Sequence, residues 1–308
     1  MLDITLLGTG ALLPLPERAL TAAALTCQGR TILFDCGEGT QTAMRRWKVS
    51  PMKVDVIALT HFHGDHIFGL PGLLSTLNSL SRTAPLTLVG PEGLRTELAP
   101  ILALTGALPY PLRLVTLPEG GAALAELAQG WPDGARLTAF RTEHRVPSQG
   151  YVFELLRPGR FLPEKARALG VPTRLWGLLQ RGERVEWAGE TLLPEQVLGP
   201  ARRGLKCVFS GDTLPCDRLA EAARDADLLI SEATYGEDDQ APLAAARGHM
   251  TFSQAAQIAA RAGVRRLWLA HFSQTIEDPA ACLPNARRWF GEAACGEDGM
   301  RVALGFED

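Results

Sequence analysis

The sequence predicts an α/β domain with one inserted segment, and three observations lead to this organisation. Short apolar runs alternate along the chain with stretches whose apolar residues recur at helical spacing. The chain has 308 residues, 46% hydrophobic and 21% charged, which is enough to build a sizeable globular core. One segment, residues 157–203, breaks the alternation and is rich in Pro, Gly and Arg. We therefore expect a catalytic domain made of residues 1–156 and 204–308, with residues 157–203 as an inserted arm.

The expected β-strands are apolar runs bounded by Gly, Pro or polar residues. They cover residues 2–7, 22–26, 31–35, 54–60, 86–89, 112–117, 136–141, 151–155, 206–210, 228–231 and 266–270. The second and third of these are separated by Cys27-Gln-Gly-Arg, which predicts a hairpin.

Helical spacing of apolar residues predicts helices over residues 39–47, 71–80, 92–105, 217–224, 251–262 and 279–290. The helix over residues 251–262 is amphipathic, which is typical of an element that packs against a core. Within the arm, only residues 164–169 have this spacing. The rest of the arm is expected to be irregular.

Charge is distributed unevenly. The formal net charge is −3, but residues 157–206 hold ten Lys or Arg against five Glu, so this segment carries +5 and the remainder −8. A basic segment on an acidic body makes the arm a candidate interaction element.

Cysteine usage and the N-terminus indicate the compartment. The six cysteines show no Cys-x-x-Cys spacing, which argues against a disulfide framework or a thiolate zinc site and favours buried free thiols. The chain starts Met1-Leu-Asp-Ile without a basic region, and no stretch reaches the roughly 20 apolar residues of a membrane helix. We expect a cytoplasmic protein without a membrane partner.

The strongest functional signal is a cluster of ligand-type residues directly after the predicted strand 54–60. Alternate residues of an extended chain point to the same side, so the first two histidines should face one point, and a glycine lets the next pair turn back toward it. Imidazole and carboxylate are ligands that zinc prefers where one coordination position stays open for water. Four such residues within six positions suit two neighbouring ions better than one tetrahedral ion. They are His61, His63, Asp65 and His66.

Three further ligand-type residues follow the ends of other predicted strands, namely His144, Asp212 and His271. In an open α/β sheet these ends gather along one edge, where ligands bind. A lone histidine is more often an ordinary core or surface residue, but three in one short motif favour a metal site. Two ions about 4 Å apart would share a hydroxide, and Asp212, which has two carboxylate oxygens, is suited to bridge them.

These motifs resemble a known family. His-x-His-x-Asp-His after a strand resembles the metallo-β-lactamase superfamily, which implies an αββα sandwich with a dinuclear zinc site. Other stretches resemble one branch, the ribonuclease Z family of tRNA 3′-processing endonucleases, over most of the chain. They include Leu7-Gly-Thr-Gly-Ala, Leu33-Phe-Asp-Cys-Gly-Glu-Gly-Thr-Gln, His63-Gly-Asp-His-Ile-Phe-Gly-Leu-Pro-Gly-Leu-Leu, Glu143-His-Arg-Val-Pro, Gly150-Tyr-Val-Phe-Glu, Phe209-Ser-Gly-Asp-Thr, Glu232-Ala-Thr and Arg247-Gly-His-Met-Thr.

The resemblance implies a role for each site residue. His61, His63 and His144 would hold one zinc ion, and Asp65, His66 and His271 the other, with Asp212 shared. Asp65 would also orient the attacking water. His249 together with Glu232 would deliver a proton to the leaving oxygen. The reaction would be cleavage of precursor tRNA after the discriminator nucleotide by a metal-bridged hydroxide, with zinc or manganese as the metal.

The resemblance also gives the arm a function. Phe161-Leu-Pro-Glu-Lys-Ala-Arg-Ala-Leu-Gly-Val-Pro is similar to the protruding exosite that grips the tRNA elbow in bacterial members of the family. Arg174, Arg181 and Arg184 would then pair with phosphates in a salt-dependent way. The family arrangement further implies a homodimer in which the arm of one subunit serves the site of the other. A solvated loop whose charges serve solubility is the alternative.

Two other functions stay open. The chain has Ser231 before Glu-Ala-Thr, Met250 after His249, and Thr275-Ile276 where the family pattern has Arg-Tyr. These departures leave room for a hydrolase of small phosphodiesters, sulfate esters or lactones. The third possibility is an RNA-binding protein that has lost turnover, although retention of all seven ligands argues against it.

Overall fold

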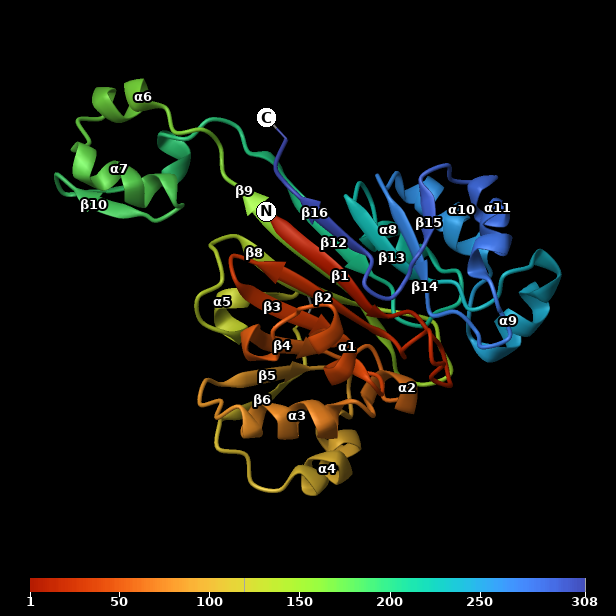
Figure 1. The fold of residues 1–308 in the computed structure, drawn as a ribbon. Helices are drawn as coiled ribbons and strands as arrows, with labels where there is room; N and C mark the ends of the chain where they lie inside the picture. Colours follow the sequence, from red (N-terminus) through yellow and green to blue (C-terminus); the bar gives the residue numbers. More distant parts are fainter. Residues whose placement is uncertain (119, 308) are drawn as a thin grey trace.

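The computed structural model describes residues 1–118 and 120–307. Two mixed seven-stranded sheets pack face to face and helices cover both outer faces, which confirms the predicted αββα sandwich (Figure 1). The strand orders are β16-β1-β2-β3-β4-β5-β6 and β15-β14-β13-β12-β9-β8-β7. Each sheet combines antiparallel strands at one end with parallel strands at the other.

The first sheet comes mainly from the N-terminal half. Its strands are β1 (Leu2–Gly8), β2 (Ala22–Cys27), β3 (Arg30–Phe34), β4 (Val54–Ala58), β5 (Leu86–Val89), β6 (Leu112–Val115) and β16 (Arg301–Leu304). Its helices are α1 (Thr40–Arg46), α2 (Gly64–Ile67), α3 (Leu70–Ser79) and α4 (Leu94–Thr105), with a 3-10 turn η1 (Pro51–Lys53). Strands β2 and β3 form the predicted hairpin.

The second sheet follows in the sequence. Its strands are β7 (Ala122–Ala123), β8 (Ala135–Arg141), β9 (Gln149–Arg157), β12 (Arg202–Phe209), β13 (Leu228–Glu232), β14 (Leu267–Ala270) and β15 (Ala293–Cys295). Its helices are α5 (Leu124–Leu127), α8 (Asp217–Ala222), α9 (Ala241–Arg247), α10 (Phe252–Ala262) and α11 (Pro279–Arg287), with a 3-10 turn η3 (Asp238–Gln240).

Alternating apolar residues place each sheet between two cores. On β13, Leu228 and Ile230 face the central core between the sheets, and Leu229 faces the outer core under α8, α10 and α11. On the first sheet, Val89 of β5 faces the central core while Leu88 packs beneath α1, α3 and α4. Successive side chains of a strand point to opposite faces, so this pattern sandwiches each sheet between apolar layers.

Helix α10 illustrates how local sequence sets an element boundary. The Thr251 hydroxyl accepts from the Gln254 N–H (3.3 Å), and the Gln254 side chain accepts from the Thr251 N–H (2.9 Å), a reciprocal capping box. Gly263 ends the helix in the left-handed conformation that glycine adopts without strain. The cap sets the start of α10 shortly after His249, with Thr251 two residues further along the chain.

The arm is folded, and the prediction of an irregular segment with one helix was wrong. It contains α6 (Pro163–Ala168), α7 (Thr173–Gln180), the hairpin β10 (Val185–Trp187) and β11 (Glu190–Leu192), and a 3-10 turn η2 (Pro194–Gln196). Its own small core is formed by Ala166, Val171, Leu179, Val185, Leu192 and Val197. The apolar residues are spread over short elements, so no window of the sequence shows a long periodic pattern. The arm protrudes from the sandwich at the outer end of β9 (Figure 1).

The remaining expectations concern membrane-spanning helices and the state of the cysteines. Within residues 1–118 and 120–307, none of the helices is both long and apolar enough to cross a membrane. All six cysteines are free thiols. Four of them are buried, but Cys282 and Cys295 are partly exposed, so burial holds for the majority only.

Candidate metal centre

The predicted ligands lie at one edge of the sandwich, directly after strand ends. His61 and His63 follow β4, and Asp65 and His66 lie in the short helix α2, which begins at Gly64. His144 follows β8, Asp212 follows β12 and His271 follows β14. Strands β12, β13 and β14 run parallel, so their carboxyl ends meet at this edge. The two sheets thereby bring all seven side chains together.

One group of ligand atoms combines residues of both sheets. His61 Nε2 lies 2.9 Å from His63 Nδ1 and 3.5 Å from Asp212 Oδ2. His144 Nε2 lies 3.4 Å from the same nitrogen of His63. The four ligand atoms lie within 4.8 Å of one another, which is compact enough to surround one ion.

A second group lies beside the first and consists of Asp65, His66 and His271. The Nε2 atoms of His66 and His271 are 3.2 Å apart, and Asp65 Oδ2 lies 3.4 Å from His271 Nε2. Asp212 joins the two groups, because its Oδ2 is 3.4 Å from His66 Nε2 and its Oδ1 is 3.4 Å from His271 Nε2. The structure brings the seven side chains into two neighbouring groups, and their division between two ions stays a prediction.

His61, His63, His144 and Asp212 favour the protonation states that bind a cation. Burial lowers the pKa of His66, but the carboxylates of Asp212 and Asp35 outweigh burial and hold that pKa well above its ordinary value. Burial lowers the pKa of the His61, His63 and His144 imidazoles, which leaves each with a free lone pair. Burial alone raises the pKa of Asp212, but the neighbouring imidazoles of His271 and His66 outweigh it and hold that pKa well below its ordinary value. Neutral imidazoles facing ionised carboxylates form a donor set that suits borderline divalent ions.

A hydrogen-bonded layer behind the ligands orients the imidazoles of the first sheet. Asp35 is fully buried, and its Oδ2 accepts from His66 Nδ1 (2.8 Å) and from the Thr60 hydroxyl (2.9 Å). That hydroxyl in turn accepts from His61 Nδ1 (3.0 Å). Both imidazoles therefore point Nε2 at the site, as bound metal requires.

The second sheet has the same arrangement of hydrogen bonds behind its imidazoles. The Thr234 hydroxyl donates to Glu232 Oε2 (2.8 Å) and accepts from His271 Nδ1 (2.9 Å). Glu232 Oε1 accepts from His249 Nδ1 (3.0 Å). Each sheet thus supplies a buried carboxylate that binds one imidazole directly and a second through a threonine hydroxyl. Sequence reasoning missed Asp35, Thr60 and Thr234, although Asp35 and Thr234 lie in motifs of the family resemblance and Thr60 directly precedes His61.

His249 lies beside the metal ligands in a different electrostatic state. Burial lowers its pKa, but the ion pair with Glu232 overcomes this and raises the pKa to about 9. Its ring nitrogen is 4.0 Å from Asp212 Oδ2, and it could be grouped with Asp212 and His271 as a third set of ligands. A protonated imidazole opposes metal binding and favours proton donation, so His249 differs from His61, His63 and His144, whose pKa burial lowers.

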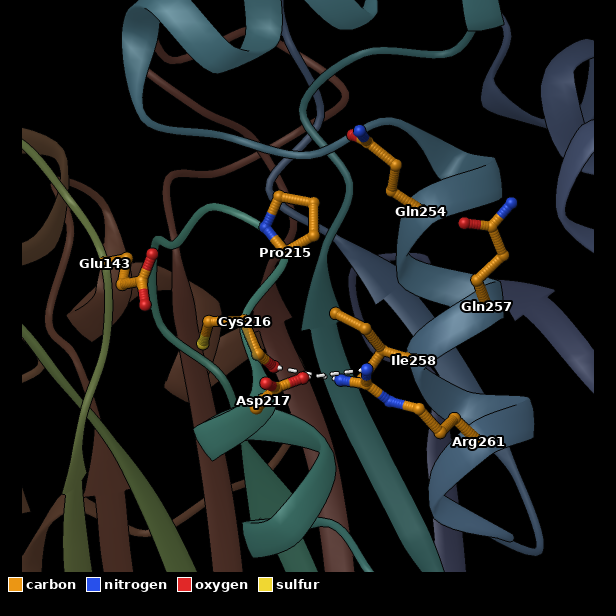
Figure 2. A pocket seen from close by; sticks show the side chains of 8 residues that line it. All are labelled: Glu143, Pro215, Cys216, Asp217, Gln254, Gln257, Ile258 and Arg261. Carbon is orange, nitrogen blue, oxygen red and sulfur yellow. Dashed lines mark hydrogen bonds and ion pairs between the residues drawn. The ribbon is translucent and has the colours of Figure 1, made fainter.

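The site opens into a cavity of about 410 Å³ lined by His63, Asp65, Asp212, His249, His271 and several apolar and charged side chains. A second cavity of about 310 Å³ lies between α8 and α10 (Figure 2). In it Arg261 pairs with Asp217 (2.8 Å), and Gln254 and Gln257 line the wall. None of the metal ligands lines this second cavity.

The three arm arginines are exposed, and none of them lines the metal-site cavity. Arg181 pairs with Glu183 (2.9 Å), and the Arg174 guanidinium lies 5.5 Å from the ring centroid of Trp187. Strand β9 starts beside the metal site, where the Gln149 N–H donates to the Thr60 carbonyl (3.0 Å), and enters the arm at its other end. Nine extended residues span about 30 Å, so the site and the arm stand at opposite ends of this strand.

Fold and site together define a metal-dependent hydrolase of the metallo-β-lactamase class. The model of the Metallo-beta-lactamase superfamily matches residues 25–249. The chain is 41% identical to "Ribonuclease Z" of Agathobacter rectalis over 308 residues, with 100% of both chains covered. It is also 41% identical to "Ribonuclease Z" of Clostridium tetani over 312 residues, again with 100% of both covered. This chain belongs to the ribonuclease Z family.

Solved structures agree with that assignment. The crystal structure of human tRNase Z, short form, is 29% identical, with a TM-score of 0.68 over 99% of this chain and 100% of that chain. The metallo-beta-lactamase fold protein YhfI from Bacillus subtilis has a TM-score of 0.69 over 98% and 100%, but at 18% identity it supports the fold alone.

Proposed function

We propose that this chain is a metal-dependent endoribonuclease that removes the 3′ trailer of precursor tRNA by cutting after the discriminator nucleotide. The observation that carries the proposal is the pair of ligand groups joined by Asp212 at the edge of the sandwich. Relatives that align over the full chain bear the name ribonuclease Z. The division into a catalytic domain of residues 1–156 and 204–308 and an arm of residues 157–203 belongs to the same proposal.

Two zinc ions per chain suit this donor set, with manganese as the other candidate. His61, His63 and His144 would hold one ion, Asp65, His66 and His271 the other, and Asp212 both. Bound divalent ions supply a Lewis acid for the phosphate and lower the pKa of a water molecule.

Asp65 is the residue we propose to orient the attacking water. Burial raises its pKa, but the hydrogen bond with His271 and the nearby His66 outweigh burial and hold the carboxyl ionised. Its Oδ2 also accepts from the Leu12 N–H (2.8 Å), which fixes the carboxylate at the cavity wall. A carboxylate held in this way can accept a hydrogen bond from water in a defined direction.

Proton delivery to the leaving oxygen falls to His249. Glu232 raises its pKa, so the imidazole carries its proton at neutral pH, and the side chain lines the cavity. An acid within reach of the departing oxygen accelerates cleavage of the ester bond. Glu232 also accepts from the Thr213 N–H (2.9 Å), which anchors the pair to the loop that carries Asp212.

The arm would bind a distant part of the tRNA. Because β9 separates the arm from the site of the same chain, only a long substrate can contact both, or the arm serves the site of a second subunit in a homodimer. Arg174 and Arg184 are exposed and are the arginines we expect to contact phosphates. Arg181 is a weaker candidate because its charge is paired with that of Glu183.

We expect the protein to act in the cytoplasm, because the free thiols of its cysteines fit a reducing compartment.

A small phosphodiester is the second candidate substrate, and one observation favours it. Arg18 donates to the carbonyls of Ser273 (3.5 Å) and Ile276 (3.2 Å), in the segment that departs from the family pattern. Its guanidinium is therefore engaged within the protein and less free to bind an RNA phosphate.

Incubation with a precursor tRNA followed by mapping of the 3′ ends tests the proposal. We expect one cut, directly after the discriminator nucleotide, that chelators abolish. Hydrolysis of bis-p-nitrophenyl phosphate without any cleavage of tRNA would support the small-substrate candidate. Binding of tRNA without cleavage at any divalent metal would instead indicate a binding protein.

A further inference from the structure

Three large apolar side chains lie exposed at the mouth of the metal-site cavity. The relative exposures of Leu12, Leu13 and Phe68 are 52%, 58% and 63%. All three line the same 410 Å³ cavity as the metal ligands. Large apolar side chains gathered in one exposed patch mark a surface that binds a ligand.

The ring of Phe68 has a defined position beside the ligands. It lies against the backbone of Gly64, where an added β-carbon would meet ring atom Cε2 at 2.4 Å. The Phe68 N–H donates to the Gly64 carbonyl (2.9 Å) at the end of α2. Since Gly64 stands between His63 and Asp65, the ring is fixed close to the atoms that face the metals.

Leu12 is held in a conformation that leucine rarely adopts. Its φ is +62°, in the left-handed region, and its N–H donates to Asp65 Oδ2 (2.8 Å). Glycine would provide the same amide at this φ without strain, so the hydrogen bond alone does not explain a leucine here. Strained residues cluster at sites that bind or react, where a particular side chain is needed.

We propose that Leu12, Leu13 and Phe68 form a platform on which the nucleobase next to the scissile phosphate stacks. The inference rests on the proposed ribonuclease function and adds the residues that hold the RNA strand at the cut. A base is joined to its phosphate through one sugar, so it can reach a surface that borders the phosphate site. Bases stack on aromatic rings independently of sequence, which suits an enzyme that processes many tRNAs.

The same cavity also offers a cationic group for the polar half of a nucleotide. Arg145 is exposed, lines the cavity and follows the metal ligand His144 in the chain. Its stem packs near Gly248, where an added β-carbon would meet Arg145 Cγ at 3.4 Å. Apolar and cationic side chains at one cavity mouth complement a nucleotide, which has a flat apolar base and an anionic phosphate.

The test combines protein variants with altered RNA. Wild type, Phe68→Ala, Phe68→Trp and the control Leu104→Ala would cleave precursor tRNA that is intact or lacks the base on either side of the cut. Leu104 is 80% exposed on α4 and does not line the metal-site cavity, so it controls for removal of an exposed apolar side chain. Thermal midpoint and metal content of each variant establish that the fold and the site are intact.

With intact RNA, Phe68→Ala should lower kcat/KM by about tenfold or more, whereas Leu104→Ala should stay near wild type. Phe68→Trp keeps an aromatic face and should retain more activity than Phe68→Ala. With the base removed on one side of the cut, wild type and Phe68→Ala should become equal, because the stacking partner is absent from both. The side on which they become equal identifies the stacked base. If Phe68→Ala loses its metal or fold, Phe68→Leu replaces it, since leucine keeps the apolar volume without the aromatic face.

The platform is overturned if Phe68→Ala cleaves intact RNA as well as wild type, or if its loss is the same with intact and both abasic substrates. The proposed function remains in either case, because wild type still cuts. If wild type cleaves no precursor tRNA at all, the ribonuclease proposal fails and the platform fails with it.

Discussion

At the scale of single residues, four of the imidazoles that face the site are oriented by what their other nitrogen binds. His66 donates to Asp35, and His61 donates to Thr60. His271 donates to Thr234, and His144 Nδ1 binds the Gly248 carbonyl at 2.8 Å. These hydrogen bonds fix the tautomer and the ring orientation, so the four Nε2 atoms converge before any metal arrives.

The substitution Asp35→Asn tests the role of the hydrogen bonds behind the imidazoles. Asparagine keeps the volume but loses the negative charge that fixes His66, so metal affinity should fall by about 10- to 100-fold in competition with a chelator. Asp55→Asn is the matched control, because Asp55 is also buried but pairs with Arg30 (3.2 Å) away from the site. Equal metal affinity in wild type and Asp35→Asn would mean that the carboxylate only supports the fold.

Asp65→Ala should lower turnover by several orders of magnitude, because a positioned nucleophile contributes much of the rate. The substitution also removes a proposed metal ligand, so metal content is measured alongside, and the thermal midpoint should fall no further than that of chelated wild type. Single-turnover cleavage of precursor tRNA measures the effect. Near-normal turnover in this variant would place the attacking water elsewhere.

His249→Ala should slow cleavage by roughly 10² to 10⁴-fold while the metal content stays the same. The pH profile gives a second readout. A donor with a pKa of about 9 is protonated below that pH, so wild-type activity should decline as the pH rises through about 9. In Glu232→Gln the negative charge that raises the pKa of His249 is gone. The decline in activity should therefore occur at a pH about 1 to 3 units lower. Loss of metal in His249→Ala would instead make His249 a ligand.

At the scale of secondary-structure elements, residues that follow strand ends form the candidate metal site, and β9 separates that site from the arm. Strands β4, β12 and β14 end within three residues of a metal ligand. Strands β9 and β12 both run between this edge and the arm, antiparallel to each other. The two ends of the arm are close together, since the Gly199 N–H donates to the Arg160 carbonyl (2.8 Å). The arm is therefore a compact insertion between two neighbouring strands.

Replacing residues 159–199 by a short Gly-Ser linker tests whether the arm contributes to tRNA binding. The KM for precursor tRNA should rise strongly, because a second binding point is lost. The kcat for bis-p-nitrophenyl phosphate should stay nearly unchanged, provided that the intact protein hydrolyses it. Wild-type affinity for tRNA should weaken as salt increases, with a smaller slope in the shortened protein. A folded, shortened protein that processes tRNA as well as wild type would show that the arm is no exosite.

At the scale of the whole molecule, the metal ligands join the two sheets. His61 and His63 follow a strand of the first sheet, and Asp212 and His271 follow strands of the second. Phe34 of the first sheet stacks on Phe209 of the second, with ring centroids 5.4 Å apart, in the core beneath the site. An ion bound between these ligands would link the sheets at an edge that the core does not cover.

Metal removal should therefore lower stability as well as activity. Elemental analysis of the purified protein should find close to two divalent ions per chain. A ligand that binds only the folded state raises the thermal midpoint with its concentration, so chelation should lower the midpoint and added zinc should restore it. An absence of metal, with activity and midpoint unchanged by chelators, would contradict the mechanism.

The sequence by itself determined the fold class and the order of most strands and helices, and it predicted the seven candidate ligands. Strand periodicity is local, and the His-x-His-x-Asp-His motif carries its chemistry within six residues. The division of these residues into two sets that share Asp212 followed from the resemblance and stays a prediction, and the structure brings the same side chains together.

Only the tertiary structure decided the rest. Asp35 and His66 are 31 positions apart, and Thr234 and His271 are 37 apart, so no local pattern joins them. The small core of the arm and its distance from the site are likewise set by packing of short elements and by the direction of β9. Local propensity fixes which segments are strands, but the burial of two apolar faces against each other fixes which side chains meet.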